Sequence, residues 1–328
     1  MARVLITGVS GQDGVYLAEQ LLARGDTVVG TTRGDPLEAR SRLSVASGSV
    51  QLRELDLRDP RAIDALMSDT MPDQIYHLAA PAAPYLAWQS PADATDGLCT
   101  VPARLLESMI RHVPAARLVY AGSCQVFGPD SAAPQNESTP FTPLTPYGAG
   151  KAFGALLVSA FRDGRRLHAS TALLFNHESS RRQADYVTTK ICRAAVRIAA
   201  GDKTATPLTL GALDVIRDWG HARDHMDALV RMADAATPAD YVIGTGVGRT
   251  VQQFCAAAFE RVGLDWKAHV THDPSLSRSG DVPALVADPR RAAERLGWHA
   301  TTSFESLLDE LLDAARGALA VAPAQPSR

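Results

Sequence analysis

Short apolar runs alternate with amphipathic stretches through the first half of the chain. The runs are nearly continuous, which is typical of strands covered on both faces, whereas a strand with one wet face alternates residue by residue. Helical periodicity at 14–25 and 61–69 separates some of them. This alternation predicts a parallel sheet with helices on both sides, a doubly wound α/β fold. The predicted strands are 3–8, 26–33, 50–57, 73–80, 116–123 and 168–176.

After about residue 177 the alternation loosens, which predicts a second, smaller domain. We expect residues 1–176, together with about 212–246, to form the domain built on the sheet. About 177–211 and 247–320 would form the smaller domain, and the tail 321–328 would be disordered. The elements predicted here are helices at 184–201, 224–236, 288–298 and 303–319 and a strand at 240–246.

Composition narrows the class of protein. The 328 residues are 46% hydrophobic and 21% charged with a net charge of −3, so no basic surface indicates binding to nucleic acid or to an anionic membrane. The cysteines, at 99, 124, 192 and 255, form no CxxC pair, which argues against structural zinc and a disulfide framework. The glycine-rich start contains no signal-peptide core and no apolar run reaches membrane-spanning length, so we expect a cytoplasmic protein.

Glycines indicate what the sheet holds. "TGVSGQDG" places Gly8, Gly11 and Gly14 between the first strand and the first helix. Glycines at such a turn let backbone N–H groups approach a pyrophosphate, and the helix N-terminus adds favourable partial charge. The first domain is therefore predicted to be a dinucleotide-binding (Rossmann) domain.

The end of the second strand bears on the choice of cofactor. An NAD site usually has a carboxylate there for the ribose 2′-hydroxyl, but this strand ends in Thr31, Thr32 and Arg33, with Asp35 two residues late. A guanidinium and hydroxyls suit a 2′-phosphate, which favours NADP(H); the alternative is a surface arginine. Asp56, at the end of the third strand, could contact the adenine amine; the alternative is that it is a solvated residue at a strand end.

A hydroxyl pair and a cation suggest redox chemistry on a sugar. "TPYGAGK" places Tyr147 and Lys151 at i and i+4, on one face of a helix. A nearby cation and the nicotinamide charge would lower the pKa of the phenol, which then exchanges a proton with a sugar hydroxyl while hydride moves to the cofactor. Ser123, at a strand end in "YAGSCQVFG", would hydrogen-bond the same oxygen.

Taken together, these motifs resemble those of a family, the extended short-chain dehydrogenases/reductases that modify nucleotide sugars. Within that family the chain is most similar to the GDP-mannose 4,6-dehydratases. The likeness runs through nearly the whole chain, and "NHES" followed by two arginines and "RDWGHA" are specific to that branch. Two details, "GTTR" and "VPAL", look like the neighbouring GDP-4-keto-6-deoxymannose reductases. The segments that carry the likeness are "LITGVSGQDGVYLAEQLL", "IYHLAAP", "TPFTPLTPYGAGKAF", "LLFNHESSRR", "LGALDVIRDWGHARDHMDAL" and "LVADPRRAAERLGWHATTSFESLLDEL".

The resemblance implies which residues contact the cofactor and which contact the nucleotide sugar. A metal is not expected, because the pair His221 and His225 lacks a third ligand and the family uses none. The predicted cofactor contacts are Gly8, Ser10, Gly11, Gln12, Asp13, Gly14, Arg33, Asp56, Leu57, Leu78, Ala79, Ala80, Tyr147, Lys151 and His177. The predicted contacts to the nucleotide sugar, where cations and an amide suit a pyrophosphate and sugar hydroxyls, are Asn176, Val187, Lys190, Leu210, Gly211, Arg217 and Arg278.

The loop after the fifth strand departs from the family. Its members have serine or threonine, any residue, then glutamate, and that glutamate removes the C5 proton and helps water leave from C6. Here the sequence is Ser123, Cys124, Gln125, and an amide can neither take nor return a proton at neutral pH. Two further departures are the run 81–84 in place of a polar "QSHV"-like segment, and Leu98 in place of asparagine.

Several outcomes therefore stay open. All use C4 redox chemistry: a 4,6-dehydratase, which needs another base, or a 4-keto-sugar reductase or C4 epimerase, which need none at C5. A catalytically silent NADP-binding regulator is the remaining alternative. The resemblance also implies a homodimer through helices near 98–111 and 147–162, and "SSRR" (179–182) hints at a homotetramer.

Overall fold

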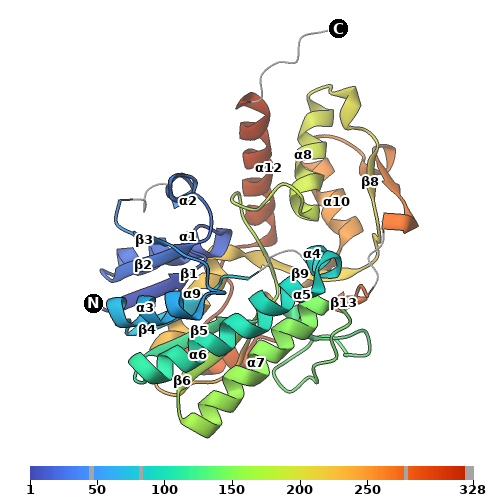
Figure 1. Ribbon diagram of the computed structural model, residues 1–328. Coiled ribbons are helices and arrows are strands. Elements are labelled where there is room, and N and C mark those ends of the chain that lie inside the picture. Colours follow the sequence, from blue (N-terminus) through green and yellow to red (C-terminus); the bar gives the residue numbers. More distant parts are fainter. Residues whose placement is uncertain (44–47, 81–83, 277–279, 322–328) are drawn as a thin grey trace.

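The computed structural model describes residues 1–43, 48–80, 84–276 and 280–321. Figure 1 shows two lobes, one built on the large sheet and one formed by the later part of the chain. Among the described residues the large sheet has seven parallel strands in the order β10-β6-β5-β4-β1-β2-β3, which confirms the predicted doubly wound fold. Its strands are β1 (Arg3–Thr7), β2 (Thr27–Thr32), β3 (Gln51–Glu54), β4 (Gln74–His77), β5 (Arg117–Ala121), β6 (His168–Leu174) and β10 (Tyr241–Ile243).

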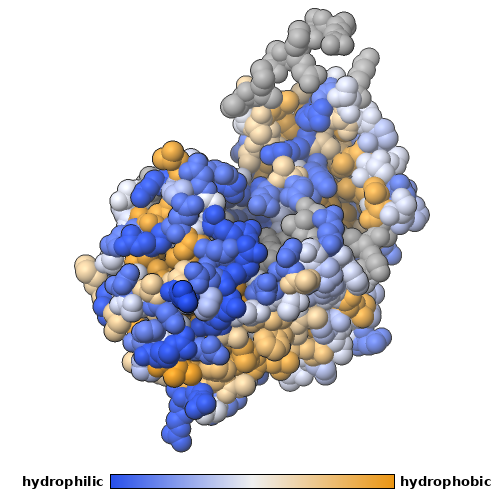
Figure 2. Space-filling model, in the orientation of Figure 1, coloured by the Kyte–Doolittle hydropathy of each residue, from blue (hydrophilic) through white to orange (hydrophobic). Residues whose placement is uncertain are grey.

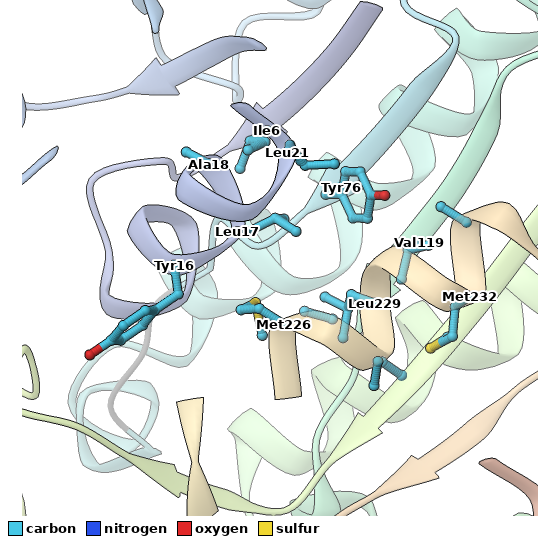
Figure 3. Packing of buried hydrophobic residues seen from close by; sticks show 14 of the residues in the cluster. Ile6, Tyr16, Leu17, Ala18, Leu21, Tyr76, Val119, Met226, Leu229 and Met232 are labelled. Carbon is cyan, nitrogen blue, oxygen red and sulfur yellow. The ribbon is translucent and has the colours of Figure 1, made fainter. Parts of the chain in front are cut away.

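Helices cover both faces of the sheet. Successive strand residues point to opposite sides, so each strand contributes side chains to the core on either face. Val4 and Ile6 lie in the core under α1 (Gln12–Ala23) and α9 (Ala222–Asp234), and Figure 3 shows these helices packing together over the strands. Leu5 lies in the opposite core. The helices on that side are α3 (Pro60–Thr70), α6 (Val101–His112) and α7 (Pro146–Arg165).

The smaller lobe has its own apolar core, formed mainly by three helices and the strands beside them. Its helices are α8 (Val187–Ala199), α10 (Val251–Glu260) and α12 (Phe304–Val321). Its strands are β7 (Asn176–Glu178), β9 (Ile216–His221), β11 (Gly248–Thr250) and β13 (Ala284–Leu285) in one sheet, and β8 (Leu208–Leu210) with β12 (Val270–His272) in another.

One late segment returns to the large sheet. Helix α11 (Arg290–Leu296) lies beside β10 and α9, and Trp298 donates its indole N–H to the Asp224 carbonyl at 2.9 Å. Trp298 is buried in the core with α9, although the sequence analysis grouped this stretch with the smaller domain. The other elements are α2 (Pro36–Leu43), α4 (Pro84–Gln89), α5 (Pro91–Thr95), the π-helical turn η2 (Asp96–Thr100), and the 3₁₀ turns η3 (Cys124–Val126), η4 (Lys203–Ala205), η5 (Trp266–Ala268) and η6 (Pro274–Leu276).

Candidate active site

The glycine turn between β1 and α1 has no room for side chains. Gly8 has a φ of +74°, and a Cβ there would lie 3.0 Å from the backbone of Ala79. A Cβ on Gly14 would lie 2.6 Å from the Gly8 carbonyl oxygen. Gly11 caps α1 without a side-chain hydrogen bond, so the first amides of the helix stay open to an anion. This arrangement fits a dinucleotide pyrophosphate.

Two residues predicted to meet the cofactor are brought together from distant parts of the chain. Asp13 Oδ2, in the first turn of α1, lies 3.1 Å from His177 Nε2 on β7. Burial alone would raise the pKa of Asp13, but the His177 and Arg182 charges and hydrogen bonds from His177 and Gln12 hold it below its usual value. Burial likewise opposes the charged form of His177, and Asp13 outweighs it and raises that pKa.

The residues expected at the adenosine end lie at neighbouring strand ends. Arg33 is exposed just after β2, close enough to Asp56 for its charge to act on that carboxyl group. Asp56 accepts hydrogen bonds from the Arg58 side chain on both oxygens, at 2.6 to 3.1 Å, and these lower its pKa to about 2. Leu57 is buried beside it. An adenine amine would therefore have to share the Asp56 carboxylate with Arg58.

Tyr147, Lys151 and Ser123 converge where β5 ends against α7. Thr145 caps α7 by accepting from the Gly148 N–H at 3.0 Å, with Pro146 at the first helical position, which sets Tyr147 in the first turn. Ser123 caps the following 3₁₀ turn, and its hydroxyl lies near enough to the Tyr147 phenol to act on the pKa of that group. The structure thus brings the predicted hydroxyl pair together.

The pKa of Tyr147 differs from the expectation drawn from the sequence. Burial raises the pKa of Tyr147, and the nearby Ser123 hydroxyl and the Arg182 charge offset only part of that effect. Burial also lowers the pKa of Lys151 to about 8, although Asp13 acts in the opposite direction. The lowered phenol pKa that we expected does not arise from these protein groups alone.

Gln125 lies in the 3₁₀ turn directly after Ser123. Its backbone N–H donates to the Ser123 hydroxyl at 3.2 Å, and its carbonyl faces α7, where a Cβ on Gly148 would lie 2.3 Å from that oxygen. The side chain is half-buried. The backbone of this turn is therefore held on both sides, next to Ser123.

The segments after β4 meet the same region. The Ala79 N–H donates to the Thr7 hydroxyl at 3.2 Å, and Leu78 packs against the core under α1. Ala80 and Tyr147 pack with Leu98 of the π-helical turn η2. Of the divergent run 81–84, positions 81–83 lie outside the described residues.

Residues predicted to bind the nucleotide sugar lie on the smaller lobe. Asn176 begins β7, and its buried Oδ1 has no hydrogen-bond partner among the described residues. Val187 begins α8 and Lys190 is exposed one turn later. Leu210 ends β8, with Gly211 next in the chain. Figure 2 shows that the surface is hollowed between the two lobes.

Arg217 is engaged more fully than we expected. It is buried on β9, donates to the carbonyls of Ile216 at 2.7 Å and Val282 at 2.8 Å, and pairs with Asp281. Its charge nevertheless reaches Cys124, whose pKa burial raises to about 12 while Arg217 acts to lower it. A sugar diphosphate would meet an arginine that is already oriented. Arg278 lies outside the described residues.

Sequence reasoning overlooked two residues that act on Tyr147. Arg182 stacks 3.6 Å over the ring of Tyr186, and its Nε lies 3.2 Å from the buried carboxylate of Glu178. Arg182 and Tyr186 both act electrostatically on Tyr147. Arg182 belongs to "SSRR", which we connected with the family and with assembly, whereas no motif in the sequence pointed to Tyr186.

The histidine pair that raised the question of a metal has other partners. His221 Nε2 lies 2.9 Å from Glu310 of α12, and His225 Nδ1 lies 3.2 Å from the His221 carbonyl. The part of the chain that the structure describes contains no group of three or more metal-binding side chains. Within the same ranges no helix is long and apolar enough to cross a membrane.

Comparison with known proteins assigns the family. A sequence model described as GDP-mannose 4,6 dehydratase matches residues 5–311. GDP-mannose 4,6 dehydratase 2 of Arabidopsis thaliana is 36% identical over 94% of this chain and 85% of its own length. The GDP-mannose 4,6-dehydratase of Sinorhizobium fredii is 34% identical over 94% and 95%. UDP-glucose 4-epimerase of Thermotoga maritima superposes with a TM-score of 0.84 at 22% identity, over 96% of this chain and 99% of that one, which shows the shared fold.

The fold and these relatives define a nucleotide-sugar-modifying enzyme of the short-chain dehydrogenase/reductase type. Within that class, the chain belongs to the GDP-mannose 4,6-dehydratase family, which confirms the resemblance seen in the sequence.

Proposed function

We propose that this enzyme oxidises C4 of a GDP-linked hexose with NADP⁺, the opening step of a 4,6-dehydratase-type reaction, and that Gln125 impairs the later loss of water. The convergence of Ser123, Tyr147 and Lys151 at the end of β5 carries this proposal. The family supports the substrate class.

Each of the three side chains has a distinct task. Tyr147 takes the proton from the C4 hydroxyl, and Ser123, whose hydroxyl acts on the Tyr147 phenol, holds the same oxygen. Lys151 places a positive charge 5.9 Å from the Tyr147 ring centroid, where it favours the phenolate. NADP⁺, when bound, accepts the hydride released from C4.

The residues of the chain also fit the two ligands. The glycine turn would hold the dinucleotide pyrophosphate, and the exposed guanidinium of Arg33 suits a 2′-phosphate. On the other lobe, the unpartnered Oδ1 of Asn176 suits a sugar or ribose hydroxyl. Lys190 and Arg217 supply positive charge for the diphosphate.

Loss of water from C5 and C6 requires a group that takes the C5 proton. Gln125 fills the family's glutamate position with an amide that cannot do so. Removing general-base catalysis costs about 10²–10⁴ in rate. We therefore expect C4 oxidation to survive and dehydration of GDP-mannose to be slow.

The test compares the wild type with Gln125→Glu, and with Gln125→Ala as the matched control that removes the amide without adding a carboxylate. GDP-mannose and NADP⁺ are incubated in D₂O, and products are read for loss of 18 mass units and deuterium at C5. We expect both signals to rise about 10²-fold or more in Gln125→Glu alone. A wild type that dehydrates as fast as Gln125→Glu would show that another residue is the base.

A 4-keto-sugar reductase or a C4 epimerase is the second candidate, and the same amide favours it because neither reaction needs a base at C5. The products separate the three. A gain of two mass units from a 4-keto sugar and NADPH indicates reduction. An isomer of unchanged mass indicates epimerisation.

We also propose that the protein is a homodimer or homotetramer. Apolar side chains stay exposed on α6 and α7: Ile110 at 37%, Phe153 at 46% and Leu156 at 61%. Figure 2 shows apolar residues gathered over these two helices. A second copy of the chain would bury this surface. Light scattering that gives a monomer at micromolar concentration would contradict the proposal.

A further inference from the structure

Lys151 is a buried cation with an unusual set of neighbours. The residue is only 4% exposed, and its Nζ donates a hydrogen bond to the Ala121 carbonyl at 2.6 Å. Among the described residues no carboxylate lies within 4.0 Å of the ammonium group. The centroid of the Tyr120 ring, however, lies 5.2 Å from Nζ. This is within the range at which the face of an aromatic ring attracts a cation, and the attraction is strongest at sites without water.

The ring of Tyr120 is held firmly in place. Tyr120 is buried on β5 and stacks on His77 of β4, with ring centroids 5.8 Å apart and planes 29° apart. On the other side it meets α7, where a Cβ on Gly154 would lie 2.3 Å from the phenol oxygen and 2.5 Å from Cζ. Only a glycine lets α7 approach the ring this closely. The same helix carries Lys151 one turn earlier.

The hydroxyl group of Tyr120 does not explain the residue. Its oxygen is buried and has no hydrogen-bond partner among the described residues. A buried phenol without a partner costs stability, and phenylalanine would avoid that cost. What Tyr120 offers to the site is therefore its ring face.

We propose that Tyr120 is a positioning residue for the reaction: its ring face and the Ala121 carbonyl hold the Lys151 ammonium group charged and directed toward Tyr147. The catalytic part of this inference rests on the proposed function, whereas the electrostatic part concerns Lys151 alone.

The other titratable groups around Lys151 do not replace this contribution. Asp13 of α1 favours the ammonium form but acts from a distance, and it is itself engaged by His177. Burial and the Lys151 charge lower the pKa of His77 to about 3, so His77 is neutral. Burial raises the pKa of Tyr147 of α7, so before the cofactor binds its phenol adds no negative charge that would favour the ammonium form of Lys151. Cys99 of η2 acts on Tyr120 and is also kept neutral by burial.

The experiment reads the charge of Lys151 directly. The chain has four lysines, Lys151, Lys190, Lys203 and Lys267, so protein labelled with ¹³C at lysine Cε gives a spectrum simple enough to assign by Lys151→Met. The Cε shift is titrated in the wild type, in Tyr120→Phe, which keeps the ring, and in Tyr120→Leu, which removes it. Tyr241→Leu, a buried tyrosine of β10, is the control for lost aromatic packing.

We expect Tyr120→Leu to lower the pKa of Lys151 by about one unit, since a desolvated cation–π contact contributes roughly that much. Tyr120→Phe and Tyr241→Leu should leave it within about 0.3 units. An unchanged pKa in Tyr120→Leu, or an equal fall in Tyr120→Phe, overturns the proposal. Should Tyr120→Leu not fold, Tyr120→Met fills the space with a flexible apolar chain and serves the same comparison.

Turnover adds the catalytic readout. With the wild-type Lys151 pKa at about 8, a fall of one unit reduces the charged fraction at pH 8 about fivefold. The alkaline limb of kcat should move down by the same unit in Tyr120→Leu, with KM changed less than about twofold. A limb that does not move despite a lowered Lys151 pKa refutes the catalytic role of Tyr120. A wild type that shows no C4 oxidation would refute the proposed function instead, and the titration would still decide the contact.

Discussion

Replacing Asp13 with asparagine should destabilise the protein more at pH 6 than at pH 9. Asp13 pairs with His177 over 3.1 Å, and their side chains are 25% and 11% exposed. At an effective dielectric constant of about 20, two charges at that distance attract by about 5 kcal/mol. Burying both charges offsets much of this, so we expect Asp13→Asn to cost about 2–3 kcal/mol while His177 is charged.

The sign of the pH dependence follows from the two shifts. The pKa of His177 is raised in the fold, so its contribution is complete below the unfolded value of about 6.5 and is lost as the pH rises through the folded value. The pKa of Asp13 is lowered, so its contribution is present above about 4 and is lost on acidification. At pH 9 the neutral imidazole has one N–H for two acceptors, the Phe175 carbonyl at 2.7 Å and the Asp13 carboxylate, so at most one hydrogen bond to Asp13 remains, worth about 1 kcal/mol.

Urea denaturation at pH 6 and pH 9, at one ionic strength and without ligand, measures the difference. The loss caused by Asp13→Asn should be about 1–2 kcal/mol larger at pH 6. Glu19→Gln is the matched control: Glu19 is on the same helix and pairs with Arg181 at 2.7 Å, and arginine keeps its charge throughout. Equal losses at both pH values for Asp13→Asn, or a larger loss at pH 9, would refute the ion-pair reasoning.

Two further predictions concern single side chains. Arg33→Ala should weaken NADP⁺ binding about tenfold or more and leave NAD⁺ binding unchanged, because a guanidinium–phosphate contact is lost; calorimetric titrations that show no change in NADP⁺ affinity would count against it. Gly154→Ala should cost about 2–4 kcal/mol in urea denaturation, since its methyl group would overlap the Tyr120 ring, whereas Gly164→Ala on the same helix meets nothing within 4 Å and should gain about 0.5–1 kcal/mol. Equal effects at the two glycines would show that α7 can move away from β5.

The sequence was sufficient for features that repeat or lie close together in the chain. Continuous apolar strands predicted the parallel sheet, and the i, i+4 spacing predicted that Tyr147 and Lys151 share a helix face. The contact between Asp13 and His177 joins residues 164 positions apart, and the resemblance implied only that each of them meets the cofactor. Two partners of Arg217 are the backbone carbonyls of Ile216 and Val282, which leave no trace in residue types, and the third, Asp281, lies 64 positions away in the chain.

Tyr120 shows a different limit. Tyr120 lies within an apolar strand, where a tyrosine is an ordinary residue, so the sequence offers no reason to single it out. What distinguishes it is the approach of α7 at Gly154, which depends on how the helix packs. Pairwise geometry of this kind has no period and no spacing, so it becomes visible only in three dimensions.

The junction of the two sheets limits how this enzyme can diversify. β6 ends at Leu174 and β7 begins at Asn176, with only Phe175 between them. Neighbouring residues of β7 serve the two proposed ligands, Asn176 the sugar nucleotide and His177 the dinucleotide through Asp13. Because side chains alternate along a strand, one inserted or deleted residue here would exchange their directions and disable both halves together. Substrate preference should therefore diverge among descendants through the loops of the smaller lobe, while the length of this junction stays constant.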